Sequence, residues 1–418
     1  MSTALSANTE TVRINIDRLW DSLEKMAETG PGIAGGCNRQ ALTDEDDKGR
    51  KLFVEWCQQA GLSVTVDQMG TLFASRPGSD PQAAGIYIGS HLDTQPTGGK
   101  YDGVLGVLSG LEVVRTLNDH GIRTQRPIVI SNWTNEEGSR FAPSMLASAV
   151  FAGVYSLEYA HGLKDQAGIT LGQELTRLGW LGSEPVGKRT MHAYLEYHIE
   201  QGPILEAQHK TVGVVTHCQG QSWLEVTLTG RSAHTGSTPM TMRANAGLAM
   251  ARIIDAVDHI AMAHQPNAAG SVGQIKVYPN SRNVLPAKVI FTIDIRAADK
   301  HKFDRICTLV RDKIREISHA HGVAFSIEKI GHYDPVEFDA DMTGIIRQAA
   351  EDMNYPHMDI TSGAGHDATW IARVAPTAMI FCPCVGGVSH NESEAISPEW
   401  AQAGANVLLQ TALQLANT

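Results

Sequence analysis

The chain is poor in cysteine, with only six among its 418 residues. So few thiols in so long a chain do not form a disulfide framework of the kind that stabilises small secreted domains. Cys382 and Cys384 are separated by one residue, whereas a CxxC redox pair needs two. We therefore expect all six cysteines to be reduced and most of them to be buried.

Long apolar runs and an excess of positive charge are also missing. No run reaches the roughly 18 residues of a membrane-spanning helix. The polar start from Met1 to Glu10 lacks the basic end and the apolar core of a signal peptide. The net charge of -11 argues against nucleic acid or an anionic membrane as a partner. These absences predict a cytoplasmic protein without a nucleic-acid or membrane partner.

The length of the chain and the order of its expected elements indicate two domains, because 418 residues exceed what one core usually organises. In the first half, helices and strands alternate, which is typical of an α/β sheet. The expected helices are Val12 to Glu28 and Asp47 to Ala60, and the expected strands are Ser63 to Asp67, Ile86 to Ser90 and Ile128 to Trp133.

Around Val212 the pattern changes to that of antiparallel strands with two long helices. The expected strands are Val212 to Val215, Trp223 to Thr229, Ser271 to Tyr278, Lys288 to Arg296 and Ala324 to Lys329, and the expected helices are Met240 to His259 and Lys300 to His321. The order β-α-β-β-α-β is the ferredoxin-like arrangement. We predict a small α+β domain of residues 217–331, inserted into a larger α/β domain of residues 1–216 and 332–418.

Possible metal ligands follow two of the expected strands. His91 comes at the end of the apolar run Ile86 to Ile88, and Asp102 lies in the glycine-rich loop beyond it. The run ending at Trp133 leads to Glu136 and Glu137. Adjacent side chains on an extended segment point in opposite directions, so one of these carboxylates can bind metal while the other handles protons.

Two further histidines complete a mixed set of imidazole and carboxylate ligands. His198 stands in the segment HIEQGP and His390 in SHNE. A single histidine at a strand end is more often structural, and a Glu-Glu pair alone is more often a solvated loop. Agreement between four separate segments favours a metal site. The set that we predict suits zinc or manganese: His91, Asp102, Glu137, His198 and His390.

Several segments together resemble the hydantoinase/carbamoylase family of amidases, a branch of the dinuclear M20-type metallopeptidases. They are GSHLDTQPTGGKYDGVLGVL, TNEEGSRF, HIEQGPILE, GRSAHTGSTPM and VGGVSHNESE. The resemblance covers nearly the whole chain, and general M20 peptidases lack the HIEQGP segment. It implies a zinc-peptidase-like catalytic domain with a mixed sheet, and an inserted lid or dimerisation domain through which two chains associate.

The resemblance also implies the reaction, which is hydrolysis of a carbamoyl or ureido group. The expected substrates are N-carbamoyl-L-amino acids or N-carbamoyl-β-alanine, with allantoate as an alternative. An M20-type aminoacylase or dipeptidase would share the metal ligands without needing HIEQGP. A non-catalytic binding protein would have no need for Glu136 beside a ligand. The implied cofactors are two divalent ions per chain, Zn²⁺ or Mn²⁺, with Co²⁺ as a substitute.

Roles at the metal centre are carried over by motif. His91 and His198 would hold one ion, Glu137 and His390 the other, and Asp102 would bridge them. Glu136 would be the general base that activates water and then protonates the leaving nitrogen. Asp93 would orient His91 from behind with its carboxylate. The peptide bond between Asp102 and Gly103 is a candidate for the cis form.

Roles in substrate binding are also implied by the resemblance. On composition alone, Arg296 would be a partner in a surface ion pair and His234 a loop histidine. In the family, the matching arginine binds the substrate carboxylate, the histidine polarises the carbonyl oxygen, and Asn283 reaches the same site. Gln201 would contact substrate. The loop Gly363 to Asp367 would line the pocket, and for His366 within it a structural role is as expected as a functional one.

Overall fold

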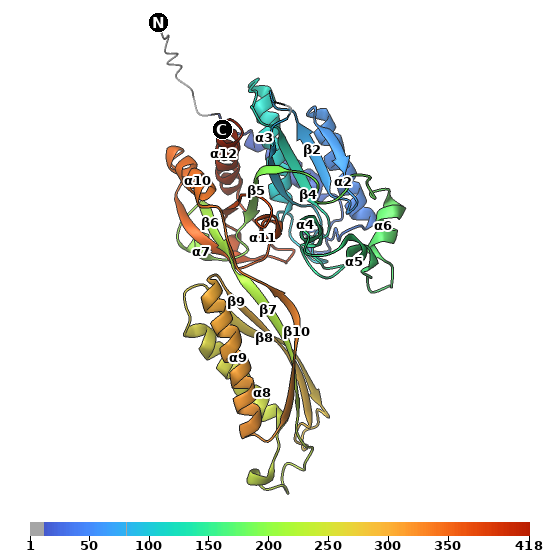
Figure 1. The fold of residues 1–418 in the computed structure, drawn as a ribbon, viewed down its shortest axis with the longest axis vertical. Helices are drawn as coiled ribbons and strands as arrows, with labels where there is room; N and C mark the ends of the chain where they lie inside the picture. Colours follow the sequence, from blue (N-terminus) through green and yellow to red (C-terminus); the bar gives the residue numbers. More distant parts are fainter. Residues whose placement is uncertain (1–11, 81) are drawn as a thin grey trace. The chain divides into compact units, whose positions relative to one another are not determined.

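The computed structural model describes residues 12–80 and 82–418, which form two compact units (Figure 1). The larger unit comprises the described residues up to Thr216, together with Phe338–Ile360 and Gly365–Thr418. The smaller unit comprises His217–Glu337 and Thr361–Ala364. The expectation that Met1 to Glu10 is not a signal peptide concerns residues outside the described part of the chain.

The larger unit is built on a mixed sheet, as predicted. Its strands run in the order β1-β2-β4-β3-β5-β13-β6-β11, and β12 pairs with β6. Strands β4, β3, β5 and β13 are parallel to one another, whereas β1 with β2, β2 with β4 and β13 with β6 are antiparallel. The bounds are β1 Ser63–Val66, β2 Leu72–Arg76, β3 Gly85–His91, β4 Ile128–Trp133, β5 Met191–Ile199, β6 Val212–Cys218, β11 Val336–Glu337, β12 His357–Ser362 and β13 Thr377–Cys382.

Helices cover this sheet, and its central strands are buried along their whole length, as is typical of parallel strands packed on both faces. α3 and α12 pack against the central strands; α3 is almost wholly buried, and most residues of α12 are buried. The helices are α1 Ile16–Ala27, α2 Asp44–Gln59, α3 Val104–Asp119, α4 Leu146–Phe151, α5 Leu157–Gly162, α6 Leu171–Leu178, α7 Ile204–Ala207, α10 Ala340–Asp352, α11 Asp367–Ile371 and α12 Pro398–Leu415, with a 3₁₀ turn η2 at Val385–Gly387. None of the described helices has the length and apolar character to span a bilayer.

Strand β5 shows how the sheet separates core from chemistry, since its side chains alternate between two faces. Leu195 and Tyr197 belong to the apolar core that includes residues of α3 and α12. Glu196 points the other way, where its carboxylate accepts the backbone N–H of Ala368 in α11 at 2.8 Å. His198 shares that second face. The alternation therefore places a polar side chain at the carboxyl end of a central strand without burying it in the apolar core.

The smaller unit has the β-α-β-β-α-β order and an antiparallel sheet in the order β10-β7-β9-β8. Its elements are β7 Gly220–Thr229, η1 Met240–Met242, α8 Ala246–Met262, β8 Ala268–Tyr278, β9 Lys288–Ala297, α9 Lys300–Ala320 and β10 Ala324–Tyr333. The helix expected from Met240 begins later, at Ala246, because the Asn245 side chain caps it by accepting the N–H groups of Gly247 and Leu248. The helices and one face of the sheet enclose a core of their own.

All six cysteines are free, and five of them are buried, as expected for reduced thiols. Burial raises the pKa of Cys382 and of Cys384 to about 12, with their mutual proximity adding to the effect at Cys382. Thiols with such high pKa values are poor nucleophiles at neutral pH. We therefore assign these cysteines to packing.

One buried carboxylate in the larger unit makes folding stability depend on pH. Asp67, in the turn between β1 and β2, is 1% exposed, and its Oδ1 accepts the N–H groups of Met69 and Thr71 at 2.8 and 2.9 Å. Burial raises its pKa to about 7, against the opposing effect of these hydrogen bonds. Because the folded-state pKa exceeds the unfolded value of about 3.9, Asp67 destabilises the fold progressively as the pH rises from about 4 to 7.

We expect Asp67→Asn to stabilise the protein at pH 8 by up to about 4 kcal/mol and to have little effect at pH 4.5. Asparagine keeps the oxygen that accepts both N–H groups and removes the charge. The measurement is the free energy of unfolding in urea for both proteins at both pH values. A difference between the two proteins that is the same at pH 4.5 and pH 8 would contradict this account.

Candidate metal centre

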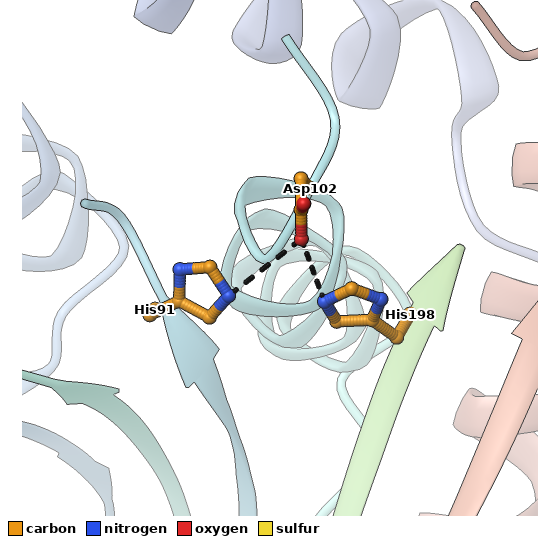
Figure 2. Close-up of side chains that lie close together, drawn as sticks. All are labelled: His91, Asp102 and His198. Atoms are coloured by element: carbon orange, nitrogen blue, oxygen red, sulfur yellow. Dashed lines mark ion pairs between the residues drawn. The ribbon is translucent and has the colours of Figure 1, made fainter. Parts of the chain in front are cut away.

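Two histidines from neighbouring elements of the sheet meet at one carboxylate. His91 ends β3 and His198 lies near the end of the adjacent parallel strand β5, so both stand at the carboxyl edge of the sheet, where α/β folds bind ligands. Asp102 comes from the loop before α3. Its Oδ1 lies 3.8 Å from His91 Nε2 and 3.1 Å from His198 Nε2 (Figure 2). All three side chains are buried.

A second group of ligand atoms faces the other oxygen of Asp102. His390 Nε2 lies 3.3 Å from Asp102 Oδ2 and 3.4 Å from Glu137 Oε2. Within each group of three residues the ligand atoms lie within 4.8 Å of one another, and the two groups share Asp102. The structure thus brings together all five residues that the sequence indicated. Imidazoles and carboxylates at this spacing fit a pair of borderline divalent cations such as Zn²⁺ or Mn²⁺.

Electrostatics in this cluster favour a cation. Burial raises the pKa of Glu136 well above its usual value, and the carboxylates of Asp367 and Glu137 add to this effect. Burial also raises the pKa of Glu137, followed by the charge of Asp102. Several carboxylates held so close together out of water are costly without positive charge between them. A divalent cation would supply that charge.

Glu136 and Glu137 point to different partners, as adjacent residues on an extended segment do. Glu137 Oε2 faces His390, and it accepts a hydrogen bond from Gln95 Nε2 at 2.7 Å. Glu136 Oε2 instead lies 3.5 Å from His91 Nε2. Glu136 is therefore placed beside one group of ligands without belonging to either group of three.

The expectation that the Asp102 carboxylate is followed by a cis peptide is wrong. Among the described residues, the cis bonds all precede proline, at Pro143, Pro266 and Pro279. The unusual geometry lies instead at Gly103, with a φ of 70°. A Cβ there would stand 2.3 Å from the ring of His91. Glycine is needed because it tolerates this φ and lets the start of α3 approach the histidine.

The role expected of Asp93 also needs correction. His91 Nδ1 does face Asp93, but its partner at 2.8 Å is the backbone oxygen. The carboxylate oxygens accept the backbone N–H groups of Glu136 and Glu137, each at 3.2 Å. Asp93 therefore orients His91 through its main chain, and its side chain fixes the turn that carries the two glutamates.

The HIEQGP segment supplies more than a ligand. The carboxylate of Glu200 accepts the backbone N–H groups of Ile204 and Leu205 at 2.7 and 2.8 Å, which fixes the turn after β5. Gln201, with a φ of 57°, directs its side-chain amide to Asp102 Oδ2 at 2.9 Å and to Ser389 Oγ at 3.1 Å. The predicted substrate-contacting residue thus borders the metal ligands.

The other predicted substrate residues lie in the smaller unit. His234 and Asn283 are exposed and close together, since His234 pairs with Val284 and the Thr235 N–H donates to the Asn283 backbone oxygen at 3.0 Å. Arg296 is on β9, where its Nε and Nη2 bind the carboxylate of Asp294 at 3.0 to 3.2 Å. The catalytic and binding roles of these three residues stay predictions.

The loop Gly363 to Asp367 divides between the two units. Gly363 belongs to the smaller one and accepts a hydrogen bond from Arg296 Nη1 at 2.7 Å. His366 belongs to the larger one, where it is buried with its ring centroid 4.4 Å from that of His198. Burial and the neighbouring His198 hold the pKa of His366 well below its usual value, so it is a neutral imidazole beside the predicted ligand His198.

Sequence reasoning missed three residues that contact the ligand cluster: Gln95, Ser389 and Glu394. Each stands inside a segment that the sequence had already singled out, HLDTQ or SHNESE. Their nearness in sequence to a predicted ligand was thus the signal that could have identified these three residues. Which of these side chains turns toward the ligands depends on loop conformation, and periodicity does not encode it.

Known proteins are similar to this chain in sequence and fold over almost their entire length. The family model described as peptidase family M20/M25/M40 matches residues 87–414. The chain is 63% identical to an N-carbamoyl-L-amino-acid amidohydrolase of Rhizobium meliloti, over 99% of both chains. It is 35% identical to such an enzyme of Geobacillus stearothermophilus, over 96% of this chain and 98% of that one. A hydantoinase/carbamoylase family amidase from Burkholderia multivorans superposes with a TM-score of 0.94 at 52% identity, covering 97% of this chain and 99% of that structure.

Proposed function

The chain belongs to peptidase family M20/M25/M40 and, within it, to the hydantoinase/carbamoylase amidases, and we propose that it hydrolyses the carbamoyl group of an N-carbamoyl-L-amino acid or N-carbamoyl-β-alanine. It is a hydrolase of C–N bonds in linear amides. The observation that carries the proposal is the pair of ligand groups sharing Asp102, with Glu136 beside them. Such a pair suits hydrolysis at a carbonyl carbon.

In the proposed mechanism, His91, His198 and Asp102 would hold one divalent ion, and Asp102, Glu137 and His390 would hold the second. When bound, the ions supply Lewis acidity for the carbonyl and lower the pKa of water. Glu136 accepts the proton of the attacking water and delivers it to the amino nitrogen as the C–N bond breaks. The products are the free amino acid and carbamate, which decomposes to ammonia and carbon dioxide.

The residues of the smaller unit have proposed roles toward the substrate. We assign His234 to donating a hydrogen bond to the oxygen that becomes negative in the transition state. Asn283 lies on a neighbouring segment, where its backbone oxygen accepts the N–H of Thr235, and it would bind the substrate as well. Gln201, from the larger unit, would contact the ureido group.

The guanidinium of Arg296 keeps donors free for a substrate carboxylate. It has five N–H groups. Contacts with Asp294 and with the Gly363 oxygen engage one N–H on each of its three nitrogens. One N–H on Nη1 and one on Nη2 then remain. A carboxylate could accept both in a bidentate pair. Asp294 and Gly363 would thus orient the arginine without occupying it fully.

We expect Arg296→Ala to lower kcat/KM by the equivalent of about 2 to 5 kcal/mol, the range for removing one member of a desolvated charge pair. Arg296→Lys should recover only part, since an ammonium has no planar fork. The assay compares an N-carbamoyl amino acid with its carboxamide analogue: the unmodified enzyme should strongly prefer the acid, and the alanine variant should not.

The matched control for this prediction is Arg315→Ala in the same unit. Arg315 is exposed and pairs with Asp312 across one helical turn, an interaction worth about 0 to 1 kcal/mol. The Arg315→Ala substitution should leave kcat/KM unchanged for both the acid and its carboxamide analogue. Equal discrimination between acid and carboxamide in the unmodified and Arg296→Ala enzymes would remove Arg296 from the substrate site.

We propose that the protein works in the cytoplasm as a homodimer formed through the smaller unit. Free, mostly buried thiols suit a reducing compartment. Strand β8 is an edge of the four-stranded sheet and is 11 residues long, with exposed Ile275 and Tyr278. A long edge strand of this kind offers unpaired backbone groups to a second copy.

The substrate assignment is tested by measuring ammonia release from three compounds, an N-carbamoyl-L-α-amino acid, N-carbamoyl-β-alanine and allantoate. Each is assayed with added zinc, manganese or cobalt. Preferred turnover of one of the first two supports the proposal, and preferred turnover of allantoate selects the alternative. Activity on N-acetyl amino acids or dipeptides without any on the three ureido compounds would instead identify an aminoacylase or dipeptidase.

A further inference from the structure

Glu394 is a buried carboxylate that connects the two groups of metal ligands without belonging to either. It is 5% exposed and lies four residues beyond His390. Its Oε1 accepts the backbone N–H groups of Tyr101 and Asp102, both at 3.1 Å. Its Oε2 lies 3.1 Å from Ser389 Oγ. One side chain therefore contacts the residue shared by both ligand groups and the residue next to His390.

The contacts of Ser389 extend this connection to the ligand atoms. Ser389 Oγ is 3.3 Å from Asp102 Oδ2, so the serine hydroxyl stands between the Glu394 and Asp102 carboxylates. Because a hydroxyl has one proton, it donates to one carboxylate at a time. Glu394 thus contacts Asp102 directly through the backbone N–H, and the Ser389 hydroxyl lies within hydrogen-bonding distance of both carboxylates.

The local backbone is shaped around this carboxylate. A Cβ at Gly99 would stand 2.0 Å from Glu394 Oε1, so only glycine leaves room for the side chain to reach the loop before Asp102. A buried carboxylate is costly unless its oxygens are hydrogen-bonded. Here two backbone N–H groups and a hydroxyl meet it, which holds both the carboxylate and the loop in one arrangement.

We propose that Glu394 is a positioning residue, which fixes Asp102 and the His390 loop in the relative orientation that two metal ions require. The proposal rests on the proposed metal-dependent function. Carboxylates that orient ligands from outside the coordination shell typically change metal affinity or activity by about 10- to 100-fold when they are replaced. The effect should be on metal affinity, because Glu394 reaches the ligands and not the substrate.

Glu392 offers a matched control two residues away. Its carboxylate also accepts backbone N–H groups, those of Ala34 and Gly36, but it contacts none of the five ligands. Glu392→Gln and Glu394→Gln therefore make the same chemical change in the same loop. They differ in that Glu394 is buried and contacts the backbone N–H of Asp102, whereas Glu392 is partly exposed and contacts Ala34 and Gly36.

The experiment measures Zn²⁺ binding to metal-depleted full-length enzyme by competition with a chromophoric chelator, and kcat at saturating zinc. We expect Glu394→Gln to bind zinc about 10- to 100-fold more weakly, with most of kcat recovered at saturation. Glu392→Gln should match the unmodified protein in both. Unchanged affinity in Glu394→Gln, or an equal loss in Glu392→Gln, would overturn the proposal.

A second variant covers the case in which Glu394→Gln does not fold. Ser389→Ala leaves Glu394 in place and removes the hydroxyl that contacts Glu394, Asp102 and Gln201, so it should weaken zinc binding in the same direction by a smaller factor. Zinc affinity equal to that of the unmodified protein would then overturn the proposal. If the unmodified protein binds no zinc, the metal-dependent function fails first, and this outcome is distinct from the others.

Discussion

Replacing Glu136 by glutamine is expected to lower kcat by at least about 10²- to 10⁴-fold, the usual contribution of a positioned general acid-base group. The amide keeps the shape of the side chain but cannot accept a proton from water. Glu136 is placed for this role because its Oε2 lies 3.5 Å from His91 Nε2, beside one group of predicted ligands. Metal content should stay the same, because Glu136 lies outside both groups of ligands.

The adjacent glutamate is the matched control for this prediction. Glu137→Gln makes the same chemical change one residue along, but it alters a residue that faces His390 at 3.4 Å. It should lower the affinity for one ion, and added metal should restore part of the activity. The measurements are kcat and metal content per chain for both variants. If Glu136→Gln lost metal and Glu137→Gln kept it, the two roles would have to be exchanged.

Removal of metal by a chelator is expected to reduce activity to background, and added Zn²⁺ or Mn²⁺ is expected to restore it. The reason is that the carboxylates and imidazoles around Asp102 form two groups suited to divalent ions, which would polarise the carbonyl and lower the pKa of water. Elemental analysis of fully active protein should give two ions per chain. His198→Ala and His390→Ala should each bind one fewer ion, since each histidine belongs to one group.

A fully active enzyme with one ion or none would refute this prediction. A surface histidine controls for nonspecific effects of the substitution: His259, paired only with Asp255 on the exposed side of α8, should be replaceable by alanine without change in metal content. Equal loss of metal in all three alanine variants would point to a general effect on folding and away from ligation.

Much of the fold follows from local patterns in the sequence. Strand β4 has the predicted bounds, Ile128–Trp133, because a short apolar run between turn residues has few alternatives. The predicted ligands stand at or near the ends of strands or in the loops that follow them, and short motifs mark these places in the sequence: His91 ends β3, and His198 is the penultimate residue of β5. The start of α8 was missed by several residues, because the apolar pattern continued upstream of its real cap at Asn245.

The predictions that were wrong at the metal centre concern contacts between segments far apart in the chain. The family resemblance implied that the Asp93 carboxylate supports His91, yet it binds the turn at Glu136, 43 residues away. Glu394 contacts the Asp102 backbone across 292 residues. Periodicity reports on neighbours in a helix or strand and holds no information on such contacts. Pairings of this kind emerge only when the sheet assembles.

The way the smaller unit is joined to the rest gives it the character of an exchangeable module. Its first and last strands, β7 and β10, are paired with each other, with Gln221 opposite Tyr333. Opposite residues in an antiparallel pair lie about 5 Å apart, a gap that a tight turn can close. The stretch between these two strands can therefore vary in length or sequence without stretching the chain on either side.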